Sequence, residues 1–498
     1  MKTIITSLLG ILLFQQSQAF CGFYVARSSL DLFNHASQVI LAKNGKQLTV
    51  TMYSDFHGDP KDFAMVVPVP EVLKRDQIQV IKKDIFNRLN EFTGPRLVKY
   101  HDKDIFCTPP PERPVYIRGY ASTQVESVLA GKVLGVSVRR NKKYKVKVKE
   151  RYKIDGYEIL ILSTKKSKGL ELWLKDHGYQ IPEGASEVLE PYIKSDMKFF
   201  VVKVDMESFK QKKDAYLHPI QIHYTSSRFM LPIRLGMANA KGDQDMIVYA
   251  FSKKGRIECS NYQTHEIPSN VDIPLPVASN FDLFYKSLFD KSWEKGGKNG
   301  VLLEYGWDIS GSSAIKCDPC PSPVLTYAQL KEAGVDWLNN WGGSQYHGKL
   351  YASRLHVRYN RSSFPQDLLF QETPNWENFQ GRYVLRYPAK IYNNDYSCDK
   401  AQDYLKILRN RRQKEVESLT ELTDWPATSY QNYIREYDEH INLNSYISPL
   451  ESNKDKGGIP FPSKWRNYFW YLFLGISTWL FIKYLQRKSS RNLKNINI

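Results

Sequence analysis

The chain has 498 residues, of which 42% are hydrophobic, 13% aromatic and 24% charged, and its formal net charge is +18. Disordered chains are poor in aromatic and aliphatic residues, so this composition excludes wholesale disorder, a collagen-like repeat and a low-complexity sequence. Six cysteines are too few for a small scaffold held together by disulfides, and the length favours roughly two to four domains or lobes.

Residues 1–19 are typical of a secretory signal peptide. Lys2 is followed by a short apolar run, and Ser17 and Ala19 provide the small residues of a cleavage site. The run is too short to span a bilayer, and the bulky Phe20 argues against lipid attachment at Cys21. We therefore expect the following segment to be extracytoplasmic. An uncleaved anchor or a buried helix is the alternative.

The segment at 20–397 is expected to be rich in strands. Short β-type runs are bounded there by Gly, Pro, Asn and Asp, which predicts an α+β fold of mostly antiparallel strands. Residues 38–52 predict a hairpin around an Asn-Gly turn, and residues 145–162 predict a second hairpin around an Asp-Gly turn.

An internal similarity suggests two lobes in this segment. Residues 64–69 (AMVVPV) and 199–204 (FFVVKV) are apolar runs of the same pattern. We place the lobes at 20–190 and 191–397. A helix is expected at 169–175, between the two runs.

Residues 398–440 are predicted to form helices. Between Asp399 and Leu422 the apolar residues fall on one face, so an amphipathic helix is expected to pack on the sheets. The residues placed mostly on the opposite, solvent-facing side are Arg409, Arg411, Arg412, Lys414 and Glu415. A shorter helix is expected at 429–437. Residues 441–466 contain prolines and glycines without a helical period, which is typical of a stalk.

Residues 467–485 are predicted to form a single membrane-spanning helix. The stretch from Tyr468 to Ile482 carries no charge, and at about 1.5 Å per residue the whole segment is long enough for a thin hydrocarbon core. The tail at 486–498 is basic, which favours the cytoplasmic side. These features predict a single-pass membrane protein with an N-terminal ectodomain outside the cytoplasm and a cytoplasmic C-terminus. A buried amphipathic helix or a peptide in the membrane interface is the alternative.

Several sequence blocks resemble those of a known family, in the same order. The blocks are CGFYVA at 21–26, GDPKDFAMVVPVP at 58–70, GLELWLKDHGYQIP at 169–182, FMLPIRLGMAN at 229–239, CDPC at 317–320, RLHVRY at 354–359, DLLFQET at 367–373 and NFQGRYVLRYP at 378–388. On these blocks the chain resembles domain-of-unknown-function family 2330. The resemblance implies a bacterial extracytoplasmic protein, and it implies no particular activity, substrate or cofactor. The spacing at 310–316, just before CDPC, is wider than the family pattern.

The cysteines lie in the part predicted to be extracytoplasmic, where an even number favours disulfides. The candidates are Cys21, Cys107, Cys259, Cys317, Cys320 and Cys398. The sequence does not fix their connectivity. We expect the pairs Cys21 with Cys107, Cys259 with Cys398, and Cys317 with Cys320.

The CDPC pair, Cys317 and Cys320, has the spacing of a thiol-disulfide exchange motif. Such a pair is reactive when a helix N-terminus acidifies its first thiol. Here prolines follow the pair, and the next helix-like run, 328–333, begins several residues later. A structural disulfide is therefore expected, with redox activity as the alternative. A zinc half-site is disfavoured because the sequence has no second C-x-x-C or H-x-x-x-H to complete it.

The stretch at 139–153 carries nine positive charges and one acid. Lysines alternate with valines in it, so three lysines share one face of the predicted strand. The hairpin is therefore a candidate for binding an anionic glycan or lipid. The residues concerned are Arg139, Arg140, Lys142, Lys143, Lys145, Lys147 and Lys149. The alternative is a solvated face whose lysines discourage edge pairing. The compartment disfavours nucleic acid as a partner.

The sequence contains no Ser-His-Asp order, Walker loop, H-E-x-x-H or Rossmann fingerprint. His356 alternates with Leu355 and Val357 on a predicted strand and is interpreted as half-buried or exposed. Abundant Tyr and Trp offer stacking platforms for sugar rings, although most are expected in the core. We expect a membrane-anchored binding or scaffolding ectodomain, rather than an enzyme, with no cofactor and no metal. The alternatives are the redox and the anion-binding functions above, and the oligomeric state stays open.

Overall fold

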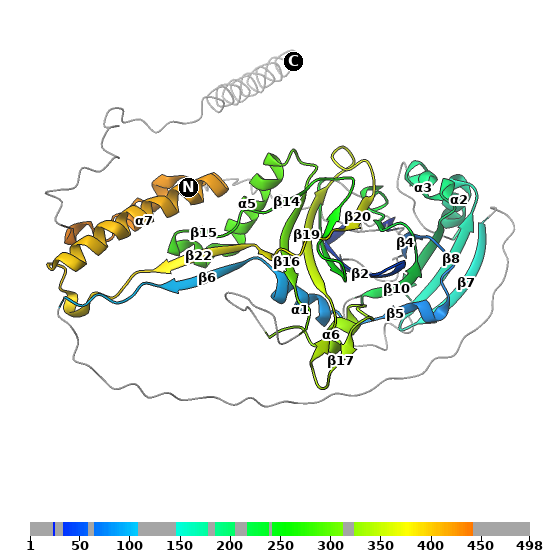
Figure 1. The fold of residues 1–498 in the computed structure, drawn as a ribbon. Helices are drawn as coiled ribbons and strands as arrows, with labels where there is room; N and C mark the ends of the chain where they lie inside the picture. Colours follow the sequence, from blue (N-terminus) through cyan, green and yellow to red (C-terminus); the bar gives the residue numbers. More distant parts are fainter. Residues whose placement is uncertain are drawn as a thin grey trace, which may run out of the picture. The chain divides into compact units, whose positions relative to one another are not determined.

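The computed structural model describes most of the chain between residues 23 and 441. The described ranges are 23–24, 33–57, 64–107, 146–177, 185–204, 217–238, 242–311 and 323–441. They form a mixed α/β fold with several sheets (Figure 1). The predicted signal peptide, membrane span and basic tail lie outside these ranges, as does the stalk beyond residue 441. Within the described ranges, no helix combines the length and the apolar character that a membrane crossing requires.

Both predicted hairpins are confirmed. Strands β2 (Phe33–Asn44) and β3 (Gln47–His57) pair in register across a turn in which Gly45 has a φ of +63°. Strands β7 (Val146–Ile154) and β8 (Tyr157–Thr164) join at Asp155 and Gly156, whose φ values are +45° and +90°. Positive φ at both turn residues explains why Asp-Gly occupies this position.

Two large sheets contain these hairpins. The five-stranded sheet has the order β1 (Phe23–Tyr24), β4 (Ala64–Val69), β9 (Lys198–Val204), β8 and β7. The nine-stranded sheet has the order β14 (Thr264–Glu266), β16 (Val301–Asp308), β19 (Tyr351–Tyr359), β12 (Gln244–Ser252), β2, β3, β10 (Ile220–Thr225) and β5 (Ile78–Val80), and β21 (Phe379–Gln380) also pairs with β16. Most strand pairs are antiparallel, but β2 with β12 and β14 with β16 are parallel.

The two sheets pack face to face around one core. Val39 and Val50 of the larger sheet pack there with Ile159 and Phe200 of the smaller one, and all four side chains are buried. Helices α2 (Ser167–Asp176) and α3 (Ala185–Lys194) cover the other face of the five-stranded sheet. Helices α1 (Asp84–Thr93) and α6 (Tyr327–Glu332) cover the other face of the nine-stranded sheet. The result is a four-layer arrangement of helices, sheet, sheet and helices (Figure 1).

The two similar apolar runs belong to one sheet. They form β4 and β9, which pair with each other along their whole length. Both are covered on both faces, since Val66 and Val201 point toward α2 and α3 whereas Val67 and Phe200 point toward the larger sheet. Burial on both faces selects continuous apolar runs, so the likeness reflects a shared environment. The expected lobe boundary at residue 190 falls inside α3.

A third assembly extends from the sandwich. Strands β15 (Val271–Asp272), β22 (Arg382–Tyr387) and β6 (Arg96–His101) form a parallel sheet. Helices α5 (Phe281–Lys295) and α7 (Asp399–Thr423) pack on it through Phe284, Tyr383 and Leu419. A further small sheet contains β11 (Met230–Leu231), β20 (Leu368–Glu372) and β13 (Ile257–Cys259).

Helix α7 confirms the predicted amphipathic helix, but two of its charged residues were placed wrongly. Arg412 is 2% exposed and Glu415 is 1% exposed. Arg412 donates to the Tyr433 carbonyl at 2.7 Å and pairs with Glu436 at 2.6 Å, and Tyr433 donates to Glu415 at 2.6 Å. The shorter predicted helix, observed as α8 (Gln431–Ile434) and a preceding 3-10 turn, brings these partners onto the face expected to meet solvent.

Candidate functional site

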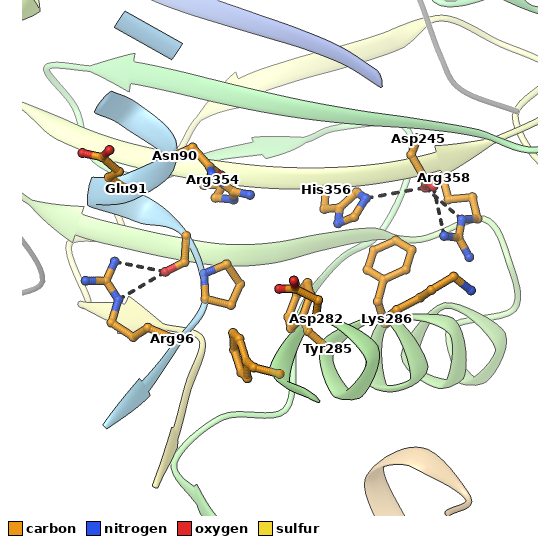
Figure 2. A pocket seen from close by; sticks show the side chains of 14 residues that line it. Asn90, Glu91, Arg96, Asp245, Asp282, Tyr285, Lys286, Arg354, His356 and Arg358 are labelled. Atoms are coloured by element: carbon orange, nitrogen blue, oxygen red, sulfur yellow. Dashed lines mark hydrogen bonds and ion pairs between the residues drawn. The ribbon is translucent and has the colours of Figure 1, made fainter. Parts of the chain in front are cut away.

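A cavity of about 540 Å³ lies between α1, α5 and strands β12 and β19. Asn90 and Glu91 line it from α1, and Arg96 lines it from the start of β6. Asp245 comes from β12, and α5 contributes Phe281, Asp282, Tyr285, Lys286 and Phe289. Figure 2 shows these side chains around Arg354, His356 and Arg358 of β19.

The pleat of β19 places three basic residues in this wall. Successive side chains of a strand point to opposite faces, so Arg354, His356 and Arg358 share one face. Leu355 and Val357, which alternate with them, are buried in the core between the two sheets. The pattern Arg-x-His-x-Arg therefore separates an apolar face from a charged one within a single strand.

Glu304 of β16 lies behind the cavity and is 0% exposed. The register between β16 and β19 shifts at this residue, between Leu303 and Tyr305. Its carboxylate accepts hydrogen bonds from Arg354 Nε and the Tyr285 hydroxyl, and His356 Nδ1 lies 2.7 Å away. Burial by itself would raise the pKa of Glu304, but the charges of Arg354 and His356 outweigh burial and hold it at about 2. Glu304 is therefore a buried anion surrounded by donors.

His356 is held between two carboxylates. Its Nδ1 faces Glu304, and its Nε2 lies 3.5 Å from Asp245 Oδ1. The Phe289 ring stacks on the imidazole with 3.8 Å between the ring centroids. Burial lowers the pKa of His356, yet the two carboxylates more than offset it, so the pKa is raised overall. With both nitrogens acting as donors, the imidazolium is favoured and neither nitrogen is available as a base or a metal ligand.

Arg358 is also fully paired. It donates to both oxygens of Asp245, at 2.8 and 3.0 Å, and its Nη1 lies 2.5 Å from Asp290 Oδ1. Asp290 in turn pairs with Lys286 at 3.0 Å. Burial opposes ionisation of Asp245, but His356 and Arg358 lower its pKa to about 2. These charges neutralise one another and fix the inner wall of the cavity.

Two guanidinium groups have N–H donors that no described residue accepts. The contacts of Arg354 with described residues use Nε, which donates to Glu304, and Nη1, which donates to Asn90 Oδ1 at 2.8 Å and to the Tyr249 hydroxyl at 3.2 Å. Its Nη2 is left over. Among the described residues, Arg96 donates only to the carbonyls of Phe92, at 2.7 Å, and Gly94, at 3.0 and 3.2 Å.

Arg96 is thus a half-buried cation without a counter-ion among the described residues. No described carboxylate lies within ion-pair distance of it, and its Nη1 is buried without a hydrogen-bond partner. Burial lowers the pKa of Arg96 to about 10, and repulsion from Arg354 contributes to the shift. A guanidinium in this state gains from any anion that enters the cavity.

Two side chains of the cavity that could take part in proton transfer are already held by Glu304. Tyr285 and His356 are committed to Glu304, and no cysteine or serine lines the cavity. Among the described residues, side chains that could ligate a metal lie close enough together in one place only. This place is formed by Cys107, Asp395 and Cys398. The two cysteines there are joined in a disulfide, so their sulfurs are not free ligands.

The predicted disulfide pairing requires correction. Cys107 pairs with Cys398, across 291 residues of sequence, and not with Cys21. The parallel pairing of β6 and β22 continues to a bridge between Ile105 and Ile391, which brings the two cysteines together. Cys259 is a free, buried thiol on β13, and burial raises its pKa well above the usual range. Cys21, Cys317 and Cys320 lie outside the described residues, as does the CDPC loop.

The basic hairpin is described only in part. Lys147 and Lys149 are exposed on β7, whereas Arg139, Arg140, Lys142, Lys143 and Lys145 lie outside the described residues. The register between β7 and β8 shifts between Val148 and Glu150, so Lys149 stands at an irregularity of the strand. β7 is an edge strand of the five-stranded sheet, where lysines discourage pairing with other chains.

Residues 15–371 match a family model described as an uncharacterized protein conserved in bacteria (DUF2330). The match includes every residue that lines the cavity, as well as Glu304 behind it. No curated protein and no solved structure matches the chain.

Proposed function

We propose that this chain, which belongs to the DUF2330 family of uncharacterised bacterial proteins, is a binding protein whose cavity holds a small anion. The observation that carries the proposal is Arg96, a half-buried cation that no described carboxylate pairs with. Arg354 lies in the same cavity with an unused Nη2. A carboxylate or a phosphate provides the oxygens that two guanidinium groups recognise.

The strength of the charge interaction supports an anion as the ligand. Two unit charges about 4 Å apart attract each other by roughly 4 kcal/mol at an effective dielectric constant near 20. The net gain for a hydrogen bond to a charged group is about 1.5–3 kcal/mol. A cavity of about 540 Å³ is in the range that holds a metabolite-sized molecule.

The buried network prepares the cavity for such a ligand. Glu304 fixes Arg354 through Nε, and Asn90 and Tyr249 fix its Nη1. The guanidinium therefore loses little side-chain entropy on binding. The exposed carboxylates of Glu91 and Asp282 lie on the rim. They disfavour a polyanion, so we propose a ligand with one or two negative charges.

The proposed location follows from the two ends of the chain. The sequence of residues 1–19 supports export, and that of 467–485 supports a single membrane anchor. We propose that the cavity faces an extracytoplasmic compartment. Protease digestion of intact spheroplasts tests this: the described region should be cleaved from outside, and a tag after residue 498 should be protected.

Substitution of Arg96 tests the anion site. Arg96→Met keeps the aliphatic length and removes the charge, and Lys99→Met is the matched control because Lys99 is exposed on the same strand. We expect calorimetric titration with inorganic phosphate, acetate, succinate and glutamate to identify at least one ligand of the unsubstituted protein. Arg96→Met should weaken its binding by about 10- to 150-fold, and Lys99→Met should not. Equal losses in the two variants, or an unchanged affinity in Arg96→Met, would contradict the proposal.

The thiol-disulfide alternative rests on Cys317 and Cys320, which the structure does not describe. It stays a prediction from the sequence. A reduction potential below about −300 mV for this pair would indicate a structural disulfide. The anionic-surface function of the basic hairpin likewise remains a prediction, and charge reversal at Lys147 and Lys149 would test it with vesicles of phosphatidylglycerol.

A further inference from the structure

Trp341 is exposed at the tip of a hairpin away from the cavity. Strands β17 (Asn339–Asn340) and β18 (Tyr346–His347) form this hairpin, which projects beyond α6 in Figure 1. The Trp341 side chain is 73% exposed, the largest value among the exposed large apolar side chains of the described residues. Tryptophan is usually well buried, so an indole held in water at a projecting tip points to a binding contact.

Hydrogen bonds fix the backbone of the turn that carries the indole. The Trp341 amide donates to the Gln345 carbonyl at 3.2 Å, and the Gly342 amide donates to Asn340 Oδ1 at 3.0 Å. Below the tip, Tyr346 is 1% exposed and donates to the Ile309 carbonyl at 2.9 Å. Gly342 has a φ of +101°, which a residue with a side chain rarely adopts. A turn with a fixed backbone loses little backbone entropy when a ligand stacks on the ring that it carries.

The hairpin carries polar side chains at its tip, and two lysines lie near its base. Asn339, Asn340 and Gln345 are exposed and carry amides that both donate and accept hydrogen bonds. At the base of the hairpin, Trp337 donates to the Lys349 carbonyl at 3.1 Å, and the Lys253 ammonium lies 5.5 Å from the Trp337 ring centroid. Exposed Lys349 itself lies 5.9 Å from the Trp376 ring centroid.

We propose that this hairpin binds an acidic polysaccharide, with one sugar ring stacked on Trp341. A sugar ring has an apolar face that stacks on an aromatic ring, and its hydroxyl groups match the neighbouring amides. Lys253 and Lys349 supply the complementary charge for sugar carboxylates. This surface shares no residue with the cavity lining, so the proposal is independent of the small-anion site.

A membrane surface fits the hairpin less well. Residues 342–345 at the tip are Gly, Gly, Ser and Gln, so no aliphatic side chain accompanies the indole. Peripheral membrane binding relies on several apolar side chains that enter the interface together. The same composition argues against an apolar protein interface, in which hot spots cluster.

Binding of the full chain to alginate, a polymer of uronic acids, tests the proposal. Dextran serves as the neutral polysaccharide and phosphatidylglycerol vesicles as the lipid surface. We expect alginate to bind more tightly than dextran, and Trp341→Ala to weaken alginate binding by about tenfold. Trp341→Phe should retain part of the affinity. Ile407→Ala is the matched control, because Ile407 is 62% exposed on α7.

Three outcomes would overturn the proposal. They are an unchanged alginate affinity in Trp341→Ala, equal affinities for alginate and dextran, and Trp341-dependent binding to vesicles in place of alginate. The cavity proposal is tested separately, because Trp341→Ala should bind the small anion with the same affinity as the unsubstituted protein. Circular dichroism and the unfolding midpoint establish that each variant is folded.

Discussion

Replacing Glu304 by Gln should lower the free energy of unfolding by about 3 kcal/mol at pH 5–6. The carboxylate is fully buried, and its pKa is held at about 2, against an ordinary value of 4.5. A difference of about 2.5 pH units corresponds to about 3 kcal/mol, since each unit is worth about 1.36 kcal/mol. Removing one partner of a buried ion pair typically costs about 3–5 kcal/mol, in agreement with this value. Gln preserves the volume, so a cavity does not contribute.

The sign of the pH dependence follows from the two shifted groups. The depressed pKa of Glu304 stabilises the fold above about pH 4.5, and this contribution is lost as the pH falls toward 2. The raised pKa of His356 stabilises the fold below its ordinary value of 6.5, and this contribution is lost as the pH rises through the value in the folded protein. The difference between the two proteins should therefore be largest between about pH 4.5 and 6.5.

Urea unfolding, followed by tryptophan fluorescence at several pH values, measures this difference. The control is Glu294→Gln, which removes a carboxylate that is 64% exposed and lies 3.6 Å from Lys298, a residue just beyond the C-terminal end of α5. An exposed pair of this kind contributes less than about 1 kcal/mol. A loss in Glu304→Gln no larger than in Glu294→Gln, or a loss that does not shrink toward pH 2, would refute the reasoning.

Two further predictions concern the cysteines. Cys398→Ser should lower the free energy of unfolding by about 2–5 kcal/mol under oxidising conditions, because the disulfide with Cys107 restricts an unfolded loop of 291 residues; added reductant should remove the difference between the two proteins. Cys259 should resist iodoacetamide in the folded protein and react after unfolding in urea, because burial raises the pKa of its thiol. Mass spectrometry of peptides containing Cys259 reports the modification, and rapid labelling in the folded state would contradict the buried position.

The elements that were predicted correctly depend on patterns within a short stretch of the sequence. The Asn-Gly and Asp-Gly turns identified both hairpins, and helical periodicity identified α7. The buried position of Arg412 was missed because the residues that cover it, Tyr433 and Glu436, follow a turn more than twenty residues later. Periodicity within one helix carries no information about such a partner.

The candidate site was not predicted, although two patterns in the sequence indicate its residues. Glu304 is a single acid in the apolar run VLLEYGW, which is the usual sign of a buried charge, and Arg-x-His-x-Arg marks a strand with one charged face. What the sequence could not provide is the pairing of β16 with β19 and of β12 with β19. These pairings bring residues 245, 304 and 356 together, and the same lack of long-range pairing explains the wrong disulfide.

The pairing of β6 has a consequence for the order in which the chain can fold as it is made. The only strand beside β6 in its sheet is β22, nearly three hundred residues later, and the disulfide from Cys107 needs Cys398. During synthesis, β6 therefore lacks its partner strand until almost the whole described chain has emerged. Arg96 begins that strand, so one wall of the cavity is completed only when residues 382–398 arrive.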